Sequence, residues 1–107
     1  MYNILTTRSF ERDAKILLKK YNSLLKDLAE LSELLALNPT KGVPLGHNCY
    51  KIRLAIKSKG KGKSGGARII TYLVNKDKTV FLLTIFDKAE KENLTPGELQ
   101  ELLKEVL

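Results

Sequence analysis

The sequence predicts an α+β fold in which an antiparallel β-sheet packs against two N-terminal helices and carries a third helix at its C-terminal end. Apolar residues recur at helical spacing over residues 10–37, follow strand spacing over residues 50–86, and return to helical spacing after residue 95. With 107 residues, 43% of them apolar and 29% charged, the chain has the composition expected of one folded domain, residues 1–107. The predicted order of elements is β-α-α-β-β-β-α.

The N-terminal part predicts one strand and two amphipathic helices. Tyr2 to Leu5 is a short run compatible with a strand, and Thr7 or Ser9 can cap the first helix. Its apolar stripe follows at i, i+4, i+7, i+8 and i+11: Phe10, Ala14, Leu17, Leu18 and Tyr21. A second helix runs from about Ser23 to Leu37 with leucines along one side, and Asn38-Pro39 ends it.

The remaining part predicts three strands and a short helix. Residues 41–48, KGVPLGHN, form a turn-rich connection, after which apolar and mostly cationic residues alternate from Tyr50 to Lys57. Ala67 to Val74 and Val80 to Phe86 predict two further strands, joined by a short polar turn. Thr95 to Glu98 reads TPGE, a capping box with proline at the first helical position, and leucines then form the apolar stripe of the last helix.

Positive charge is concentrated in the middle of the chain. The net charge is +7, but residues 41–76 contain nine lysines and arginines and no acidic residue. A basic segment of this kind is typical of a site for a polyanion. The alternative is a basic surface that serves only solubility.

The stretch KSKGKGKSGG lies between two predicted strands. Gly62-Lys63-Ser64 matches the end of a P-loop, but the first glycine of that motif is missing, and a strand rather than a helix follows. Nucleotide binding of the P-loop kind is therefore not expected. We expect a flexible hairpin loop over residues 58–66, with Lys59, Lys61 and Lys63 as point charges for a phosphate backbone, or else a solvated surface turn.

Several familiar kinds of site are missing from the sequence. His47 is the only histidine, which excludes a ribonuclease site built on two histidines, and no set of metal ligands is visible. No cofactor is expected. Cys49 is the only cysteine, which fits a reducing cytoplasm. No apolar run reaches the roughly 20 residues of a membrane helix and no secretory signal is visible, so we expect a cytoplasmic protein with no membrane partner.

Cations on two neighbouring strands are the remaining candidates for chemistry. Spacing by twos places Lys51, Arg53 and Lys57 on one face of a strand, and Arg68 and Tyr72 share a face of the next. If the two faces coincide, they form a concave cationic patch. RNA cleavage by the 2′-hydroxyl needs a base, an acid and stabilisation of the phosphorane, which lysine and arginine can supply. Alternatively, these cations only bind phosphates.

Three stretches resemble the RelE/HigB family of bacterial type II toxin–antitoxin toxins: NCYKIRLAIK at 48–57, GKSGGARIITY at 62–72 and FLLTIFDKAEKENLT at 81–95. The resemblance extends over essentially the whole chain, and GKSGG is similar to the HigB-like branch. It implies a RelE-like fold and a ribosome-dependent, metal-independent endoribonuclease, an mRNA interferase that cleaves message in the A site and inhibits translation. The implied partners are the ribosome, mRNA and a cognate antitoxin, expected to be of helix-turn-helix type.

The resemblance also implies roles for individual residues. Lys51 and Arg53 fall on the catalytic strand, Arg68 falls on the arginine that contacts the scissile phosphate, and Lys88 lies where active-site residues follow the last strand. The expected RNA-binding residues are Lys57, Lys59, Lys61, Lys63 and Tyr72. The general acid stays open between Lys88, Lys63 and Tyr72, because no tyrosine follows Tyr72.

Two other functions stay open at this point. A related toxin of ParE type would inhibit gyrase by binding, and an inactive relative would only bind RNA or the ribosome. The basic strand residues favour the nuclease over the gyrase inhibitor, and mRNA cleavage after induction distinguishes the nuclease from both.

Overall fold

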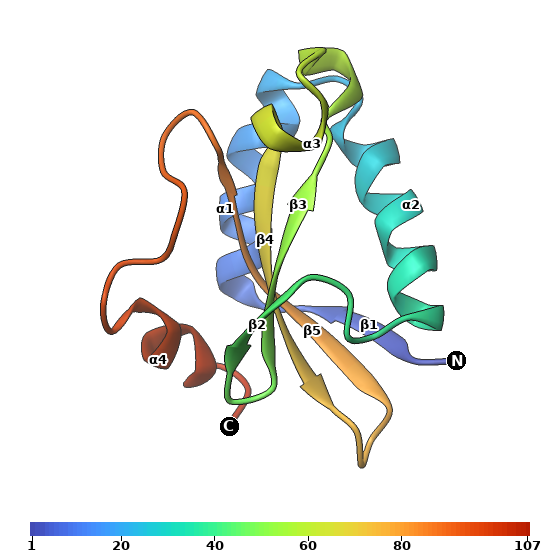
Figure 1. Ribbon diagram of the computed structural model, residues 1–107, viewed down its shortest axis with the longest axis vertical. Coiled ribbons are helices and arrows are strands. Elements are labelled where there is room, and N and C mark those ends of the chain that lie inside the picture. The colour runs from blue at the N-terminus through green and yellow to red at the C-terminus, as the bar shows by residue number, and fades with distance from the viewer.

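The structure is a computed structural model that describes all 107 residues. Its strands are β1 Asn3–Thr6, β2 Val43–Gly46, β3 Cys49–Leu54, β4 Ala67–Val74 and β5 Thr79–Asp87. Its helices are α1 Arg8–Lys20, α2 Leu24–Leu37, α3 Gly62–Gly65 and α4 Glu98–Leu103, with a short 3-10 helix, η1, at Lys57–Lys59. The strands form one sheet in the order β1-β5-β4-β3-β2 (Figure 1), which confirms the predicted α+β class. No helix has both the length and the apolar character needed to cross a membrane.

The two faces of the sheet have different coverings. Helices α1 and α2 pack on one face, where their apolar stripes meet Ile52, Leu54, Ile69 and Ile85 in the larger core. On the other face, α4 covers a smaller apolar cluster that includes Cys49. In Figure 1, α4 lies toward the lower end of the sheet and α3 toward the upper end. This arrangement leaves part of the second face, near α3, free of a long helix.

The sheet is not wholly antiparallel, which corrects the prediction. Strands β2 to β5 pair antiparallel, but β1 runs parallel to β5 at the edge of the sheet. The direction of β1 is fixed by bonds at both of its ends. Asn3 N donates to Lys78 O, just before β5, and Thr7 N donates to Leu82 O farther along β5. The Thr7 hydroxyl also accepts from Phe10 N, so the predicted helix cap is correct.

The connections differ from the sequence prediction in two places. Residues 43–46 form the edge strand β2 where a turn-rich connection was predicted, because this segment pairs with Tyr50 and Lys51 of β3. The strand predicted from Tyr50 to Lys57 ends at Leu54, and the following loop contains η1 and α3 instead of remaining extended. Lys57 therefore leaves the face that Lys51 and Arg53 share.

The last helix also begins later than the capping box predicts. Its N-cap is Gly97, which has a φ of 84°, and its first residue is Glu98. Pro96 consequently precedes the helix. The Thr95–Glu98 contact of a capping box still forms, because Thr95 N donates to Glu98 Oε1 at 2.8 Å.

Gly66 is the point where the loop after η1 rejoins the sheet. A Cβ at this position would collide with Leu54 O and would lie 3.0 Å from Ile56 N. We expect Gly66→Ala to lower the free energy of unfolding by about 3 kcal/mol or more, because backbone atoms must move to admit the methyl group. Denaturant unfolding measures this loss.

Gly62→Ala is the matched control for Gly66→Ala. Gly62 has a φ of 65°, and a Cβ there meets nothing within 4 Å. Its substitution carries only the left-handed backbone strain, about 1 kcal/mol. Equal losses in the two variants would contradict the close approach of the two chain segments at Gly66.

Candidate active site

The pairing of β3 with β4 places the predicted cations on one face of the sheet. Arg53 lies directly opposite Arg68, and Lys51 lies opposite Ile70. Since cross-strand partners point to the same side, Lys51, Arg53 and Arg68 share one face. Tyr72 pairs with Cys49 and lies on the same face, but farther along the strands.

These three cations line a cleft of about 350 Å³. Lys41, Lys63 and Glu92 also line it, and Glu92 is its only acidic residue. Sequence reasoning did not single out Lys41 or Glu92. Lys41 belonged to the acid-free segment and could have been noticed there, whereas Glu92 lies in the acidic C-terminal part and gave no such signal.

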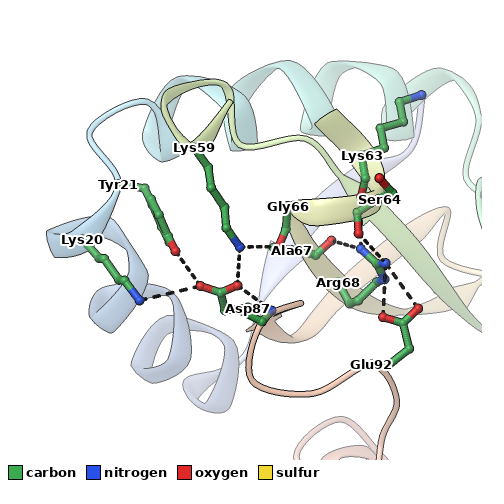
Figure 2. Close-up of polar contacts among 11 residues, drawn as sticks. Lys20, Tyr21, Lys59, Lys63, Ser64, Gly66, Ala67, Arg68, Asp87 and Glu92 are labelled. Carbon is green, nitrogen blue, oxygen red and sulfur yellow. Dashed lines mark hydrogen bonds and ion pairs between the residues drawn. The ribbon is translucent and has the colours of Figure 1, made fainter. Parts of the chain in front are cut away.

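Arg68 is a buried cation with fixed hydrogen bonds (Figure 2). Its side chain is only 2% exposed, and Nη1 donates to Lys63 O at 3.1 Å and to Ala67 O at 3.2 Å. Nη2 donates to Ser64 O at 3.3 Å and pairs with Glu92 Oε2 at 3.2 Å. Nε is buried without a hydrogen-bond partner. The guanidinium is therefore held in place by main-chain carbonyls, with one carboxylate as its counter-ion.

The segment after β5 contacts two of the cleft cations. Glu92, whose side chain is 49% exposed, pairs with Arg68, and the neighbouring Asn93 accepts a hydrogen bond from Lys51 Nζ through its Oδ1. Glu92 and Asn93 thus occupy N–H donors of Arg68 and Lys51 that a phosphate oxygen would use. A polyanion that enters the cleft must compete with Glu92 for Arg68 and with Asn93 for Lys51.

The loop between β3 and β4 is fixed to the sheet by Asp87, as Figure 2 shows. The Asp87 carboxylate is fully buried and accepts from Lys59 Nζ at 2.6 Å, from Tyr21 OH at 2.6 Å and from Ala89 N at 2.9 Å. Burial by itself raises the pKa of Asp87, but the hydrogen bonds from Lys59, Tyr21 and Ala89 N outweigh it and lower that pKa to about 2. The loop is therefore not the plain hairpin loop that was predicted, because it contains η1 and α3 and because the Lys59 side chain is 10% exposed and held in this pair.

The other predicted site residues lie outside the cleft. Lys57 pairs with Glu30 at 3.1 Å, and Tyr72 stacks on Phe81 with ring centroids 6.3 Å apart. Lys61 and Lys88 are exposed and do not line the cleft. The structure thus brings together Lys51, Arg53, Lys63 and Arg68 in the cleft, and Lys59, Lys61, Tyr72 and Lys88 lie outside it. Lys57 lines a neighbouring groove together with Arg53 and Lys63.

The sheet, its helix pair and the cationic cleft belong to a small toxin of a toxin–antitoxin system. The family described as "RelE toxin of RelE / RelB toxin-antitoxin system" matches residues 2–106. The chain belongs to this RelE toxin family. Toxins of the family are endoribonucleases that cleave mRNA, and an antitoxin is their partner. The assignment to a HigB-like branch stays a prediction.

Solved structures share the fold. A mutant of the E. coli toxin RelE in the free state is 17% identical, with a TM-score of 0.57 over 97% of this chain and 92% of the other. The isolated E. coli RelE toxin is 19% identical, with a TM-score of 0.54 over 100% of both chains. A metal-bound toxin from Helicobacter pylori is 22% identical, with a TM-score of 0.56 over 86% of this chain and 100% of that one. At these identities the likeness establishes the fold.

Because Asp87 forms an ion pair with Lys59, the stability of the fold depends on pH in the acid range. Because its folded-state pKa of about 2 lies below the unfolded value near 4, Asp87 stabilises the fold above pH ~4 and loses this contribution as the pH falls toward 2. Asp87→Asn should cost about 2 kcal/mol of unfolding free energy at pH 7. The difference between wild type and variant should shrink below pH 4 in denaturant unfolding. A difference that is constant between pH 7 and pH 2.5 would contradict the ionised pair.

Removal of the Glu92 charge should strengthen polyanion binding. Glu92→Gln leaves Arg68 without a competing carboxylate, so we expect about fivefold tighter binding of a short, non-cleavable RNA, measured by fluorescence anisotropy. Glu90→Gln is the matched control, since Glu90 is exposed on the same segment and does not line the cleft. Equal gains in both variants would indicate a general charge effect and would contradict competition at Arg68.

Proposed function

We propose that this toxin is a ribosome-dependent mRNA endonuclease that cuts message in the ribosomal A site, with the whole chain, residues 1–107, acting as one domain. The observation that supports this most strongly is the cleft itself. Five cations, Lys41, Lys51, Arg53, Lys63 and Arg68, line it with a single carboxylate. Such an excess of positive charge in one concave site suits the phosphodiester backbone of RNA.

The cleft residues have the chemistry that RNA cleavage needs. The 2′-oxygen attacks phosphorus and forms a 2′-O–P bond while the P–O5′ bond breaks, the 2′-hydroxyl proton passes to hydroxide or water of the solvent, and the leaving O5′ takes a proton from an acid. In this proposal, Arg68 and Arg53 hold the non-bridging oxygens, on which negative charge accumulates. Lys51, half-buried beside them, has transferable protons and serves the leaving oxygen.

The residues outside the cleft suit contacts with flanking RNA. Lys61 lies between η1 and α3, and Lys88 directly follows β5; both are exposed. In this proposal they bind phosphates next to the scissile one or on ribosomal RNA. In this proposal, cleavage depends on the ribosome because the ribosome holds the message extended, so that the cleft can bind its phosphate backbone. The proposed neutralising partner is an antitoxin of helix-turn-helix type, and the proposed compartment is the cytoplasm.

Arg53→Ala tests the proposal without disturbing the core. Arg53 is exposed, so the variant should fold normally while losing one of the two guanidinium groups at the phosphate. We expect cleavage to fall by about 10²–10³-fold, measured by mapping mRNA 5′-ends after induced expression and by single-turnover cleavage on purified ribosomes.

Lys76→Ala is the control for Arg53→Ala, because Lys76 is an equally exposed cation in the turn between β4 and β5, away from the cleft. Its cleavage should match wild type. Wild-type expression that arrests growth without any cut message would refute the nuclease. DNA damage in that case would indicate gyrase inhibition, and ribosome binding alone would indicate a non-catalytic module.

A further inference from the structure

A second groove adjoins the cationic cleft across the outer edge of β3. It has a volume of about 140 Å³ and lies between α2 and the segment that follows β3. Lys41, Arg53 and Lys63 line both the groove and the cleft. The two hollows are therefore neighbouring parts of one depression, with the shared cations at the boundary.

The edge of β3 is open at this place because β2 is short. Strand β2 pairs with β3 only as far as Lys51, which lies opposite Val43. Beyond Lys51, the outer side of Arg53 and Leu54 has no neighbouring strand. A chain bound in the cleft can therefore continue around this edge toward α2.

The groove has an apolar wall and an end that accepts hydrogen bonds. Leu31, Leu34 and Leu54 form the wall, and Leu34 is 55% exposed although it is apolar. Asp27 lines the groove and is 3% exposed. Its Oδ2 accepts from Ser23 Oγ at 2.8 Å and from Lys57 N at 3.2 Å, but its Oδ1 has no hydrogen-bond partner. Glu30 and Lys57 also line the groove, where Lys57 Nζ donates to both carboxylate oxygens of Glu30, at 3.2 Å and 3.1 Å.

The geometry points to a subsite for one nucleobase of the RNA, adjacent to the phosphate held in the cleft. This inference rests on the proposed function. A planar base can pack its apolar face against the leucines, since burial of apolar surface is favourable, while its phosphate stays with the shared cations. The unpartnered Oδ1 of Asp27 favours a base with an exocyclic amino group, since a carboxylate accepts a hydrogen bond from cytosine N4. Cytosine should therefore bind better than uracil, which presents a carbonyl at that position.

Binding of small nucleotides tests the subsite without requiring cleavage. Methyl NMR of the leucines should be followed during titration with cytidine 5′-monophosphate, uridine 5′-monophosphate and ribose 5-phosphate. We expect the cytidine nucleotide to shift the Leu31, Leu34 and Leu54 methyl signals by its ring current and to bind about fivefold more tightly than the uridine nucleotide. Ribose 5-phosphate should perturb the cleft residues and leave these methyl signals unchanged.

Two leucine-to-glutamate substitutions on α2, one inside the groove and one outside it, form a matched pair of variants. Leu34→Glu should weaken cytidine nucleotide binding by about tenfold while leaving ribose 5-phosphate binding within about twofold. Leu37→Glu is the control, since Leu37 is 74% exposed on the same helix and does not line the groove. It adds the same charge and should reproduce wild-type preference for the base.

The outcomes separate this inference from the proposed function. Unshifted leucine methyls with cytidine nucleotide, or equal losses in the Leu34 and Leu37 variants, would overturn the subsite. Equal binding of uridine and cytidine nucleotides would overturn the role of Asp27. Ribose 5-phosphate that binds to the cleft in any of these cases would leave the cationic site, and with it the proposed nuclease, intact. Absence of all binding would count against both.

Discussion

A buried guanidinium must be given hydrogen-bond acceptors and a counter-ion, and the region around Arg68 is arranged to meet this requirement. An unpaired buried charge costs several kcal/mol, far more than one contact returns. Lys63, Ser64 and Ala67 supply main-chain carbonyls, and Glu92 supplies the negative charge. Three of these four partners come from outside β4, so the position of Arg68 depends on how the flanking segments are held.

The flanking loop is held by a second buried charge. Asp87 ends β5, and its bond to Lys59 fixes the start of the loop whose other end supplies the carbonyls on Arg68. Lys59 Nζ also lies 3.5 Å from Gly66 O, and Lys88 N donates to the same carbonyl at 3.0 Å. The ion pair between Asp87 and Lys59 stabilises the fold and also sets the shape of the cleft. In the proposed nuclease, Lys59 would therefore act through the position of Arg68, whereas Lys63 and Lys51 line the cleft themselves.

The sequence predicted the features that have short-range periodicity. The alternation of apolar and cationic residues predicted β3, and the apolar stripes predicted α1 and α2. Spacing by twos placed Lys51 and Arg53 on one face of β3. Long-range pairs had no such signal: Asp87 lies 28 residues from Lys59, and Glu92 lies 24 residues from Arg68. The glycines and lysines of residues 58–66 predicted a plain hairpin loop, since the carboxylate of Asp87, which holds Lys59, lies on another strand. The parallel direction of β1 likewise depends on bonds to Lys78 and Leu82, which no local pattern encodes.

We propose that Arg68 is a preformed phosphate site, which Glu92 occupies until RNA binds. The most direct test of this proposal is side-chain ¹⁵N NMR of the arginines during titration with RNA that carries a 2′-deoxy nucleotide at the cleavage position. The Arg68 guanidinium signals should be protected from solvent exchange in the free protein, since the side chain is buried. They should shift on binding, together with the backbone amide of Glu92, as phosphate replaces the carboxylate. RNA that binds while the Arg68 and Glu92 signals stay unchanged would contradict the account.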